Sequence, residues 1–476
     1  MTASPNTQPS FVILGAGPAG LAAAYKLSQR GWRHVTVLER GSRVGGNAGS
    51  FVIDGIPVDF GSHRLHPVCP PPVLADIRAL LGDDLLDRPR HGRIRLRERW
   101  VHFPLRPLDL LTRLPPSFVA GVVTDAFRKP FATIEGQPSF ASILERGLGP
   151  TICRDFYFPY AEKIWGLPPA ALDPEQARRR VSSGSLAKIV RRVLGAVPGL
   201  RKPGAGRFFY PRHGYGQISD ALHAAAVGAG ATVHLNASAS AVVVEGGRVD
   251  RVEAGVCGER RTFPSDYVLS TIPVSLLARL VRTTGAPAPV DAADVLRHRA
   301  MVLVYLTLQA DQFTEFDAHY FPEAALRITR LSEPKNYSLT KREGRTVLCV
   351  ELPCAQTDAE WSMSDESLCA MVCRDLERGG LGPLPTVLGT QTRRLLQAYP
   401  LYTKGYRVAF DAIDRWAAGI DGLVTFGRQG LFAHDNTHHT MAMAYALVDC
   451  VGADGAFDRE GWARARRSFE DHVVED

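Results

Sequence analysis

Three glycines near the start of the sequence have the spacing of a phosphate-binding turn. Gly15, Gly17 and Gly20 form a GxGxxG pattern between an apolar run at 11–14 and a segment of helical composition at 21–27. The first glycine permits a tight turn, the second lets the backbone approach a pyrophosphate, and the third lets helix and strand pack closely. The helix N-terminus adds free N–H groups and the positive end of its dipole. The pattern predicts a dinucleotide site.

An acidic residue closes the next predicted strand. Residues 35–38 are apolar and end at Glu39, 19 residues after Gly20. A carboxylate at this place can accept hydrogen bonds from ribose hydroxyls. Strand, glycine turn, helix, strand and acid follow one another as in a βαβ unit, which is stronger support than a GxGxxG pattern alone. We assign Glu39 and the adjacent Arg40 to the cofactor site.

Composition sets the limits of the function. The chain has 476 residues, of which 45% are apolar and 22% charged, so we expect two or three globular domains. The net charge of +7 is compatible with an anionic substrate or cofactor and is too small to indicate nucleic acid. No apolar run reaches the roughly 18 residues of a membrane span, and the first ten residues lack the features of a signal peptide. We therefore expect a cytoplasmic protein. The eight cysteines form no CxxC pair, and we expect no metal site.

The remaining elements must bring distant parts of the chain to this turn. Apolar and alternating patterns predict strands at 232–235, 241–244, 267–271, 301–309, 347–351 and 423–426. Residues 93–103 predict a hairpin with its turn near Glu98 and Arg99. The pattern from 105 to 200 is helical, and a terminal helix begins near His439. The dinucleotide domain is therefore expected to be discontinuous, with a substrate domain inserted into it.

A second glycine pair follows the acid. Gly45, Gly46 and Asn47 begin six residues after Glu39. In this order the chain resembles the flavoprotein superfamily of monoamine oxidases, protoporphyrinogen oxidases, carotenoid desaturases and UDP-galactopyranose mutases. The resemblance implies FAD, with its pyrophosphate on residues 15–20, its ribose on Glu39 and its flavin-side chain on residues 45–47.

Further short segments follow the order of the mutase branch and together span nearly the whole chain. Residues 59–63 are similar to a GxH loop that lies over the isoalloxazine, which implies flavin contacts by Gly61, Ser62 and His63. Residues 157–165 and 209–216 resemble two more family segments. In the mutases, tyrosines and arginines hold the substrate diphosphate near the flavin, and the matching residues here are Tyr320, Arg330, Tyr337, Tyr399 and Arg428. Gly427 and Arg428 are also assigned to the cofactor. A half-buried core position is the alternative for each tyrosine.

This chain also departs from the mutase pattern. His434 stands where the mutases carry a tyrosine, the NxDH segment contains His438 in place of its acid, and Phe158 replaces an arginine. These changes put the uridine and galactose parts of a mutase pocket in doubt. We assign His434 to the substrate site.

The catalytic candidates are two histidines and two arginines. Histidine titrates in the range useful for proton transfer, so His63 and His438 are candidates, and either could instead orient the flavin. Arg330 and Arg428 complete the catalytic set as phosphate-gripping groups. Lys335 matches a lysine of the amine-oxidase branch that bonds the flavin N5 through water, although a solvated loop residue is the stronger interpretation.

The expected fold is α/β, a glutathione-reductase-type Rossmann FAD domain with an inserted mixed β-sheet and helical substrate domain. We place the FAD-binding parts at 1–87, 205–275 and 391–476, the helical insertion at 88–204 and the substrate sheet at 276–390. The expected enzyme is an FAD-dependent oxidoreductase that transfers hydride between flavin N5 and a small polar substrate, such as a phosphate- or nucleotide-activated sugar. The alternatives are a redox-neutral mutase using reduced FAD and a non-catalytic flavin-binding subunit.

Two kinds of partner are expected besides the substrate. A nicotinamide or another external electron partner would complete the redox cycle. The basic stretch at 178–202 holds eight basic residues and no acid, and is most simply a solvated helix face. Contact with an anionic membrane surface through this stretch is the alternative.

Overall fold

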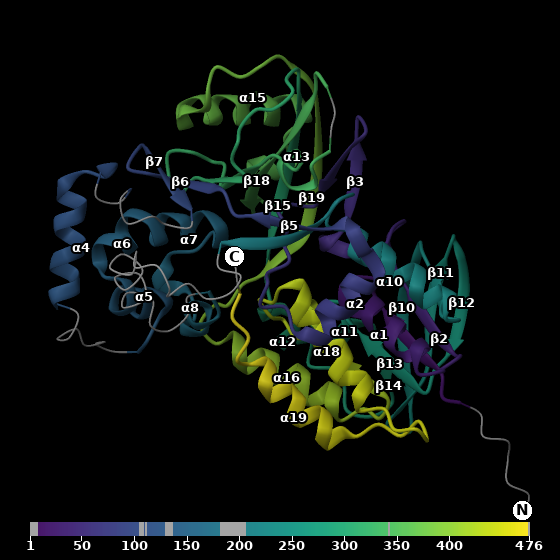
Figure 1. The fold of residues 1–476 in the computed structure, drawn as a ribbon. Helices are drawn as coiled ribbons and strands as arrows, with labels where there is room; N and C mark the ends of the chain where they lie inside the picture. The colour runs from purple at the N-terminus through teal and green to yellow at the C-terminus, as the bar shows by residue number, and fades with distance from the viewer. Residues whose placement is uncertain are drawn as a thin grey trace, which may run out of the picture.

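The parallel sheet whose first strand leads into the glycine turn lies on one side of the molecule (Figure 1). The computed structural model describes residues 8–103, 109, 112–128, 137–180, 206–340 and 343–474. Its first strand, β1 (Phe11–Leu14), is the middle strand of a five-stranded sheet and pairs in parallel with both neighbours. The strand order is β20 (Leu423–Thr425), β13 (Tyr267–Ser270), β1, β2 (Val35–Leu38) and β9 (Thr232–His234). Three distant parts of the sequence therefore build one sheet.

Both faces of this sheet are covered, which explains why its strands are apolar throughout. Phe11 and Ile13 pack into a core with the helices α1 (Pro18–Gln29), α10 (Gln217–Gly228) and α18 (Thr437–Asp449). Val12 and Leu14 point the other way, into a core with a second sheet. That sheet is formed by β12 (Glu259–Pro264), β11 (Arg248–Val256), β10 (Ala237–Glu245) and β14 (Val281–Thr283). The helices, the parallel sheet and this second sheet, in which only the β10–β14 pair is parallel, form three layers (Figure 1).

A larger mixed sheet forms the upper part of the molecule in Figure 1. Its seven strands lie in the order β19 (Val387–Pro400), β15 (His298–Leu308), β18 (Thr346–Cys354), β17 (Arg330–Ser332), β16 (Ala318–Tyr320), β6 (Gly92–Leu96) and β7 (Arg99–Phe103). The pair β16–β6 is parallel and the other pairs are antiparallel. One face packs against α15 (Asp365–Leu376). The mixed sheet predicted from the sequence is thus present.

A group of helices lies on the side of the molecule opposite β11 and β12 (Figure 1). It contains α4 (Pro116–Arg128), α5 (Phe140–Leu148), α6 (Pro150–Ile152), the π-helical turn η4 (Cys153–Tyr157), α7 (Phe158–Trp165) and α8 (Pro174–Arg180). Phe140, Leu144, Trp165 and Leu401 share a core there. Most of the basic stretch at 178–202 lies outside the described residues.

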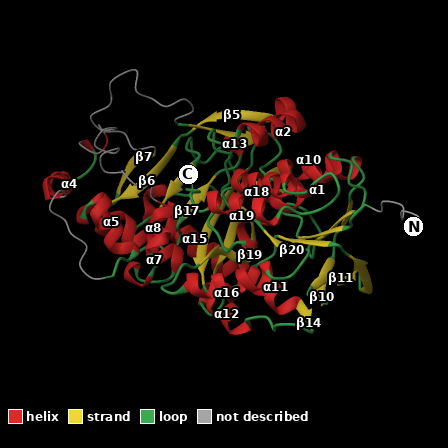
Figure 2. Ribbon diagram, turned by 90° about the horizontal axis from the view of Figure 1, so that it is seen from below, coloured by secondary structure: helices red, strands yellow, loops and turns green. Residues whose placement is uncertain are grey.

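The other elements connect these parts, and Figure 2 shows them from below. They are η1 (Gly46–Ala48), β3 (Ser50–Ile53), β4 (Ile56–Asp59), α2 (Pro71–Leu81), η2 (Gly82–Asp84), β5 (Leu85–Pro89), η5 (Pro169–Ala171), β8 (Arg207–Pro211), α11 (Val274–Leu280), α12 (Val290–Val295), α13 (Lys335–Ser338), α14 (Ala359–Ser362), η6 (Glu377–Leu381), α16 (Tyr406–Ala418), α17 (Gly427–Gly430) and α19 (Arg459–Phe469). Within the described ranges, no helix is long and apolar enough to cross a membrane.

The structure differs from the predicted elements in two places. The hairpin turn lies at Arg97 and Glu98, one residue earlier than predicted, and both residues have positive φ, as a two-residue hairpin turn requires. The strand β19 is a single strand that continues to Pro400, past the predicted domain boundary at 390. Apolar and polar side chains are mixed at its exposed positions, which include Leu388, Gln391, Arg394 and Leu396, so no regular pattern marks the strand in the sequence. The domain boundaries themselves stay predictions.

Candidate active site

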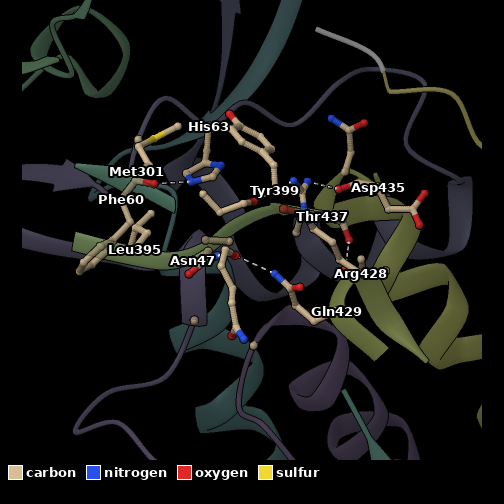
Figure 3. Close-up of a pocket in the computed structure, with 18 of the residues that line it drawn as sticks. Asn47, Phe60, His63, Met301, Leu395, Tyr399, Arg428, Gln429, Asp435 and Thr437 are labelled. Carbon is tan, nitrogen blue, oxygen red and sulfur yellow. Dashed lines mark hydrogen bonds between the residues drawn. The ribbon is translucent and has the colours of Figure 1, made fainter. Parts of the chain in front are cut away.

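Most of the predicted site residues line one cavity between the parallel sheet and the seven-stranded sheet. Its volume is about 760 Å³, a size typical of small-molecule sites. Gly15, Glu39 and Thr271 line it, and they follow directly after the strands β1, β2 and β13. In α/β sheets ligands bind at this carboxyl edge. Figure 3 shows side chains from several distant segments, among them His63, Tyr399 and Arg428, around the same space.

The glycine turn has the backbone that the spacing predicts. Gly15 has a φ of +99°, and a Cβ on Gly20 would lie 2.0 Å from the Gly15 carbonyl oxygen. Only glycine therefore allows α1 to approach β1 this closely. A Cβ on Gly17 would meet no described atom within 4 Å, and Gly17 lines the cavity. The backbone is thus open at the place where a pyrophosphate would approach.

Glu39 holds this turn as well as facing the cavity. Its Oε2 accepts a hydrogen bond from the Ala16 N–H at 2.9 Å, and its Oε1 accepts one from the Gly41 N–H at 2.8 Å. A carboxylate has about four acceptor positions, so ribose hydroxyls can still bind to it. Arg40 lines the cavity beside it and is exposed.

The second glycine pair lies against the first turn. The Gly45 N–H donates to the Ala16 carbonyl at 2.8 Å, and Gly46 and Asn47 line the cavity. The Asn47 Nδ2 donates to the Gln397 carbonyl at 3.0 Å, which ties this loop to β19 (Figure 3). The open Gly17 backbone, the Glu39 carboxylate and this loop together fit the pyrophosphate and ribose of FAD.

The Gly427–Arg428 pair approaches the start of α1 from the C-terminal part of the chain. A Cβ on Gly427 would lie 2.9 Å from the Ala19 Cβ, so this loop packs tightly on the helix. Gly427 itself does not line the cavity, whereas Arg428 does. Arg428 donates to the carbonyls of Asp435 at 2.9 Å and Ala398 at 3.1 Å. Its side chain is therefore held in place across the cavity wall.

The GxH loop forms another part of the wall. Gly61, Ser62 and His63 all line the cavity. The His63 Nε2 lies 3.0 Å from the Phe60 carbonyl, which can only accept, so Nε2 carries the hydrogen and Nδ1 does not. Burial lowers the pKa of His63, although nearby Asp59 opposes this shift. His63 is therefore a neutral imidazole near pH 7.

Arg330 is paired with a buried acid that the sequence analysis did not identify. Its Nε and one terminal nitrogen donate to the Glu351 Oε1 at 2.9 and 2.7 Å. The same oxygen accepts the Ser62 N–H at 2.9 Å. Arg330 lines the cavity, but Glu351 compensates its charge. This pairing changes the expectation that Arg330 grips a phosphate, and favours a role in positioning the GxH loop.

The aromatic and histidine candidates for the substrate divide into two groups. Tyr320 and Tyr399 line the cavity. Tyr337 is 1% exposed, its hydroxyl donates to the Asp317 carbonyl, and it lies behind the wall. His434 is fully buried among Trp165, Tyr399 and Tyr402. Neither Tyr337 nor His434 lines the cavity, so in this structure both support its wall, and their contact with a substrate stays a prediction.

His438 is likewise buried behind the wall. It is 1% exposed and does not line the cavity, although Thr437 does. Burial lowers its pKa to about 3, with further lowering by His439. The position of His438 therefore does not support proton transfer, because the residue does not line the cavity and its lowered pKa makes it a weak base.

Three neighbouring residues resemble a metal-ligand set without its geometry. Asp435, His439 and His472 have ligand atoms within 4.8 Å of one another. The rings of His439 and His472 are stacked, with centroids 4.2 Å apart and planes at 13°. Their in-plane lone pairs therefore run side by side and do not converge on one ion. The His439 Nδ1 also accepts the Asn436 N–H. We assign no metal to this cluster.

A comparison with known proteins gives the family of this chain. A family model described as flavin containing amine oxidoreductase matches residues 18–442. The chain belongs to this family. It is an FAD-dependent oxidoreductase, and the resemblance stated from the sequence is confirmed.

Individual relatives of this flavin amine oxidoreductase match either over short ranges or over nearly the whole chain at low sequence identity. It is 44% identical to the probable polyamine oxidase 4 of Arabidopsis thaliana over 77 residues, which are 16% of this chain and 15% of that protein. Protoporphyrinogen oxidase 2 of Arabidopsis thaliana is 35% identical over 107 residues, which are 21% of this chain and 20% of that protein. A crystal structure of reduced UDP-galactopyranose mutase is similar in fold with a TM-score of 0.79, at 21% identity over 98% of this chain and 99% of that chain.

Lys335 does not take the place of an active-site lysine in this oxidoreductase. Its Nζ donates to the carbonyls of Asp311 and Arg345 at 2.7 and 2.9 Å. It does not line the cavity. The solvated-loop interpretation is therefore the one that the contacts favour.

Sequence reasoning missed several charged residues of the site. Arg64, Arg90, Glu351 and Asp435 all line the cavity. Arg64 follows His63 directly in the GxH loop, and a charged residue in a loop assigned to the flavin was a usable signal. Glu351 lies within an apolar strand, where a charge usually requires a partner. Asp435 stands between His434 and the segment that resembles the NxDH motif, which was a usable signal as well. Nothing in the sequence around Arg90 indicates the cavity.

Proposed function

We propose that this FAD-dependent oxidoreductase acts on a small polar substrate that carries a phosphate, such as a phosphate- or nucleotide-activated sugar. The observation that carries the proposal is the charge of the cavity. Six arginines and three carboxylates line it: Arg40, Arg64, Arg90, Arg330, Arg394 and Arg428, with Glu39, Glu351 and Asp435. Guanidinium groups bind phosphate oxygens through paired hydrogen bonds.

The positive charge is not confined to the part of the cavity that fits FAD. Arg64, Arg90 and Arg330 lie on the side of the seven-stranded sheet, where Glu351 is the acid of the lining. A polyamine carries several positive charges and would meet like charge there. An anionic substrate would meet opposite charge.

The side chains at this end have defined tasks in the proposal. When bound, FAD supplies hydride acceptance or donation at its N5. His63 is neutral, and its Nδ1 has no hydrogen, so it can accept the substrate's hydroxyl proton as a general base. Tyr320 and Tyr399 line the space beside it and can donate hydrogen bonds to substrate oxygens.

The test is anaerobic mixing of the oxidised holoenzyme with matched compounds while the visible flavin absorbance is recorded. The set contains a sugar nucleotide, a sugar 1-phosphate, the same sugar without phosphate, and the polyamine spermine. We expect the absorbance to fall with a phosphorylated compound and to stay unchanged with the free sugar and spermine. Reduction by spermine and by no phosphorylated compound would overturn the proposal.

Ring isomerisation of a nucleotide sugar is the second candidate. It is favoured by the fact that Tyr320, Arg330, Tyr399 and Arg428, which the mutase resemblance assigns to a diphosphate, line one cavity. Its signature is an unchanged spectrum on mixing and an isomeric product only after chemical reduction of the flavin. A bound flavin that no compound perturbs would instead indicate a non-catalytic flavin-binding subunit. The external electron partner and the cytoplasmic location stay predictions.

A further inference from the structure

Arg64 is a cavity arginine with two buried nitrogens that lack a hydrogen bond to a described residue. Its side chain is 11% exposed and lines the cavity directly after His63. Its Nε and one terminal nitrogen are buried and form no hydrogen bond with any described residue. The nearest acid is Asp317, whose Oδ1 lies 3.5 Å from that terminal nitrogen. A buried guanidinium normally has its N–H groups hydrogen-bonded, so these donors call for a ligand.

The charge of Arg64 is permanent despite its burial. Burial lowers its pKa, but the carboxylate of Asp317 and the phenol of Tyr320 raise it by more, and the net shift is upward. The guanidinium also lies over the rings of Phe208 and Tyr337, with its central carbon 5.2 and 5.4 Å from their centroids. These rings and Asp317 fix the plane of the group and leave N–H donors unused.

Tyr320 adds a second unused donor beside this guanidinium. Its side chain is 8% exposed, and its hydroxyl is buried and forms no hydrogen bond within the described part of the chain. It lies at the end of β16, next to β6, and Asp317 stands just before the same strand. Arg90 precedes β6 and lines the cavity with its guanidinium 4.9 Å from the Phe103 ring. Donors from three segments of the chain therefore converge on one place.

The other arginines of the lining are differently engaged. Arg330 is bonded to Glu351, and Arg394 uses all three nitrogens on Trp361, Thr392 and Met363. Among the lining arginines, Arg64 has two buried nitrogens without a hydrogen bond to a described residue, whereas Arg90 has one.

We propose that Arg64 and the Tyr320 hydroxyl form an anion subsite next to the GxH loop, which binds the phosphate or carboxylate of the substrate. The guanidinium presents paired N–H donors to two anion oxygens, and the phenol donates to one of them. The subsite requires an anionic group on the substrate close to the reacting carbon, since Arg64 follows His63 directly. This inference deepens the proposed function and rests on it for the identity of the substrate, but anion binding can be measured without turnover.

The test is a titration of the FAD-loaded enzyme with inorganic phosphate at constant ionic strength, followed by the flavin difference spectrum. We expect saturable binding by the parent enzyme. Arg64→Met is expected to weaken it roughly 10- to 100-fold, because hydrogen bonds from a charged donor are lost. Arg64→Lys keeps the charge without the planar fork and is expected to recover part of the affinity. Tyr320→Phe is expected to weaken binding several-fold.

Arg393→Met is the matched control, because it removes the same charge from β19 at a guanidinium that does not line the cavity and is bonded to the Thr392 carbonyl and the Gln391 side chain. Its phosphate affinity is expected to equal that of the parent. Equal loss in Arg393→Met and Arg64→Met would show a general charge effect and overturn the subsite. Unchanged affinity in Arg64→Met or, if that variant fails to fold, in both Arg64→Lys and Tyr320→Phe would overturn it as well.

The same titration separates failure of the subsite from failure of the proposed function. If phosphate binding depends on Arg64 but no phosphorylated sugar reduces the flavin, the subsite stands and the sugar assignment is wrong. A repeat with acetate distinguishes the two anions. Tighter Arg64-dependent binding of acetate than of phosphate would assign the subsite to a carboxylate.

Discussion

The two ends of the cavity are built from different parts of the polypeptide. At the cofactor end, Gly17 presents backbone to the cavity and Glu39 holds the turn through backbone N–H groups. At the substrate end, Arg64 and Arg330 present side chains that pair with acids: Asp317, from a distant part of the sequence, and Glu351, on the neighbouring strand β18. Cofactor binding is therefore a property of local sequence, whereas substrate binding depends on how the sheets are assembled.

The largest expected effect tests the backbone end. Gly20→Ala places a Cβ 2.0 Å from the Gly15 carbonyl oxygen, so α1 must move away from β1. We expect loss of FAD and a lower thermal midpoint of the apoprotein. Gly17→Ala is the control, because its Cβ meets no described atom within 4 Å. That variant should lose FAD affinity while the apoprotein keeps its thermal midpoint. Equal destabilisation of both apoproteins would contradict the assigned roles.

The next effect tests the side-chain end. Glu351→Gln removes the charge that compensates Arg330, and the two side chains are 4% and 15% exposed. We expect the free energy of unfolding to fall by about 3–5 kcal/mol, because a buried charge loses its partner. Denaturant unfolding measures it. Glu360→Gln breaks a pair with Arg327, whose side chain is 61% exposed, and should cost less than about 1 kcal/mol. Similar values for the two variants would show that Arg330 is not held by Glu351.

A pH measurement tests whether His438 lies behind the wall. Its pKa is lowered from 6.5 to about 3 in the folded chain, chiefly by burial. Below pH 6.5 the histidine binds a proton in the unfolded chain but not in the folded chain, so the free energy of unfolding falls as the pH falls. Between pH 7 and pH 5 the shifted pKa of His438 lowers the free energy of unfolding by about 2 kcal/mol. His438→Gln should remove that part of the loss and leave the pH profile of flavin reduction unmoved. An equal loss of stability in parent and variant would place His438 in contact with solvent.

The smallest effect lies where the two ends meet. Asn47 donates to the Gln397 carbonyl on β19 and so joins the cofactor loop to the seven-stranded sheet. Asn47→Ala should weaken FAD binding up to about tenfold, the value of one neutral hydrogen bond. Isothermal titration of the apoprotein with FAD measures this change. A loss of a hundredfold or more would mean that Asn47 contacts the cofactor directly.

The same difference explains what the sequence could predict. The glycine turn, β2, Glu39 and the Gly45–Asn47 loop lie within 40 residues of one another. Their order predicts a dinucleotide site, and the family resemblance implies that the dinucleotide is FAD. Arg330 and Tyr337 were predicted at the substrate from short motifs, but a motif does not show which side chain reaches the cavity. Arg330 forms an ion pair with Glu351, and the Tyr337 hydroxyl donates to the Asp317 carbonyl. Arg64 was overlooked because its role depends on strands more than 200 residues away.

The most direct test of this division is a crystal structure of the FAD-loaded enzyme with inorganic phosphate. We expect this structure to show the FAD pyrophosphate against the Gly17 backbone at the start of α1. We also expect a separate phosphate that is hydrogen-bonded to the Arg64 guanidinium and the Tyr320 hydroxyl. A phosphate bonded to Arg330, with Glu351 displaced and Arg64 turned to Asp317, would contradict this expectation.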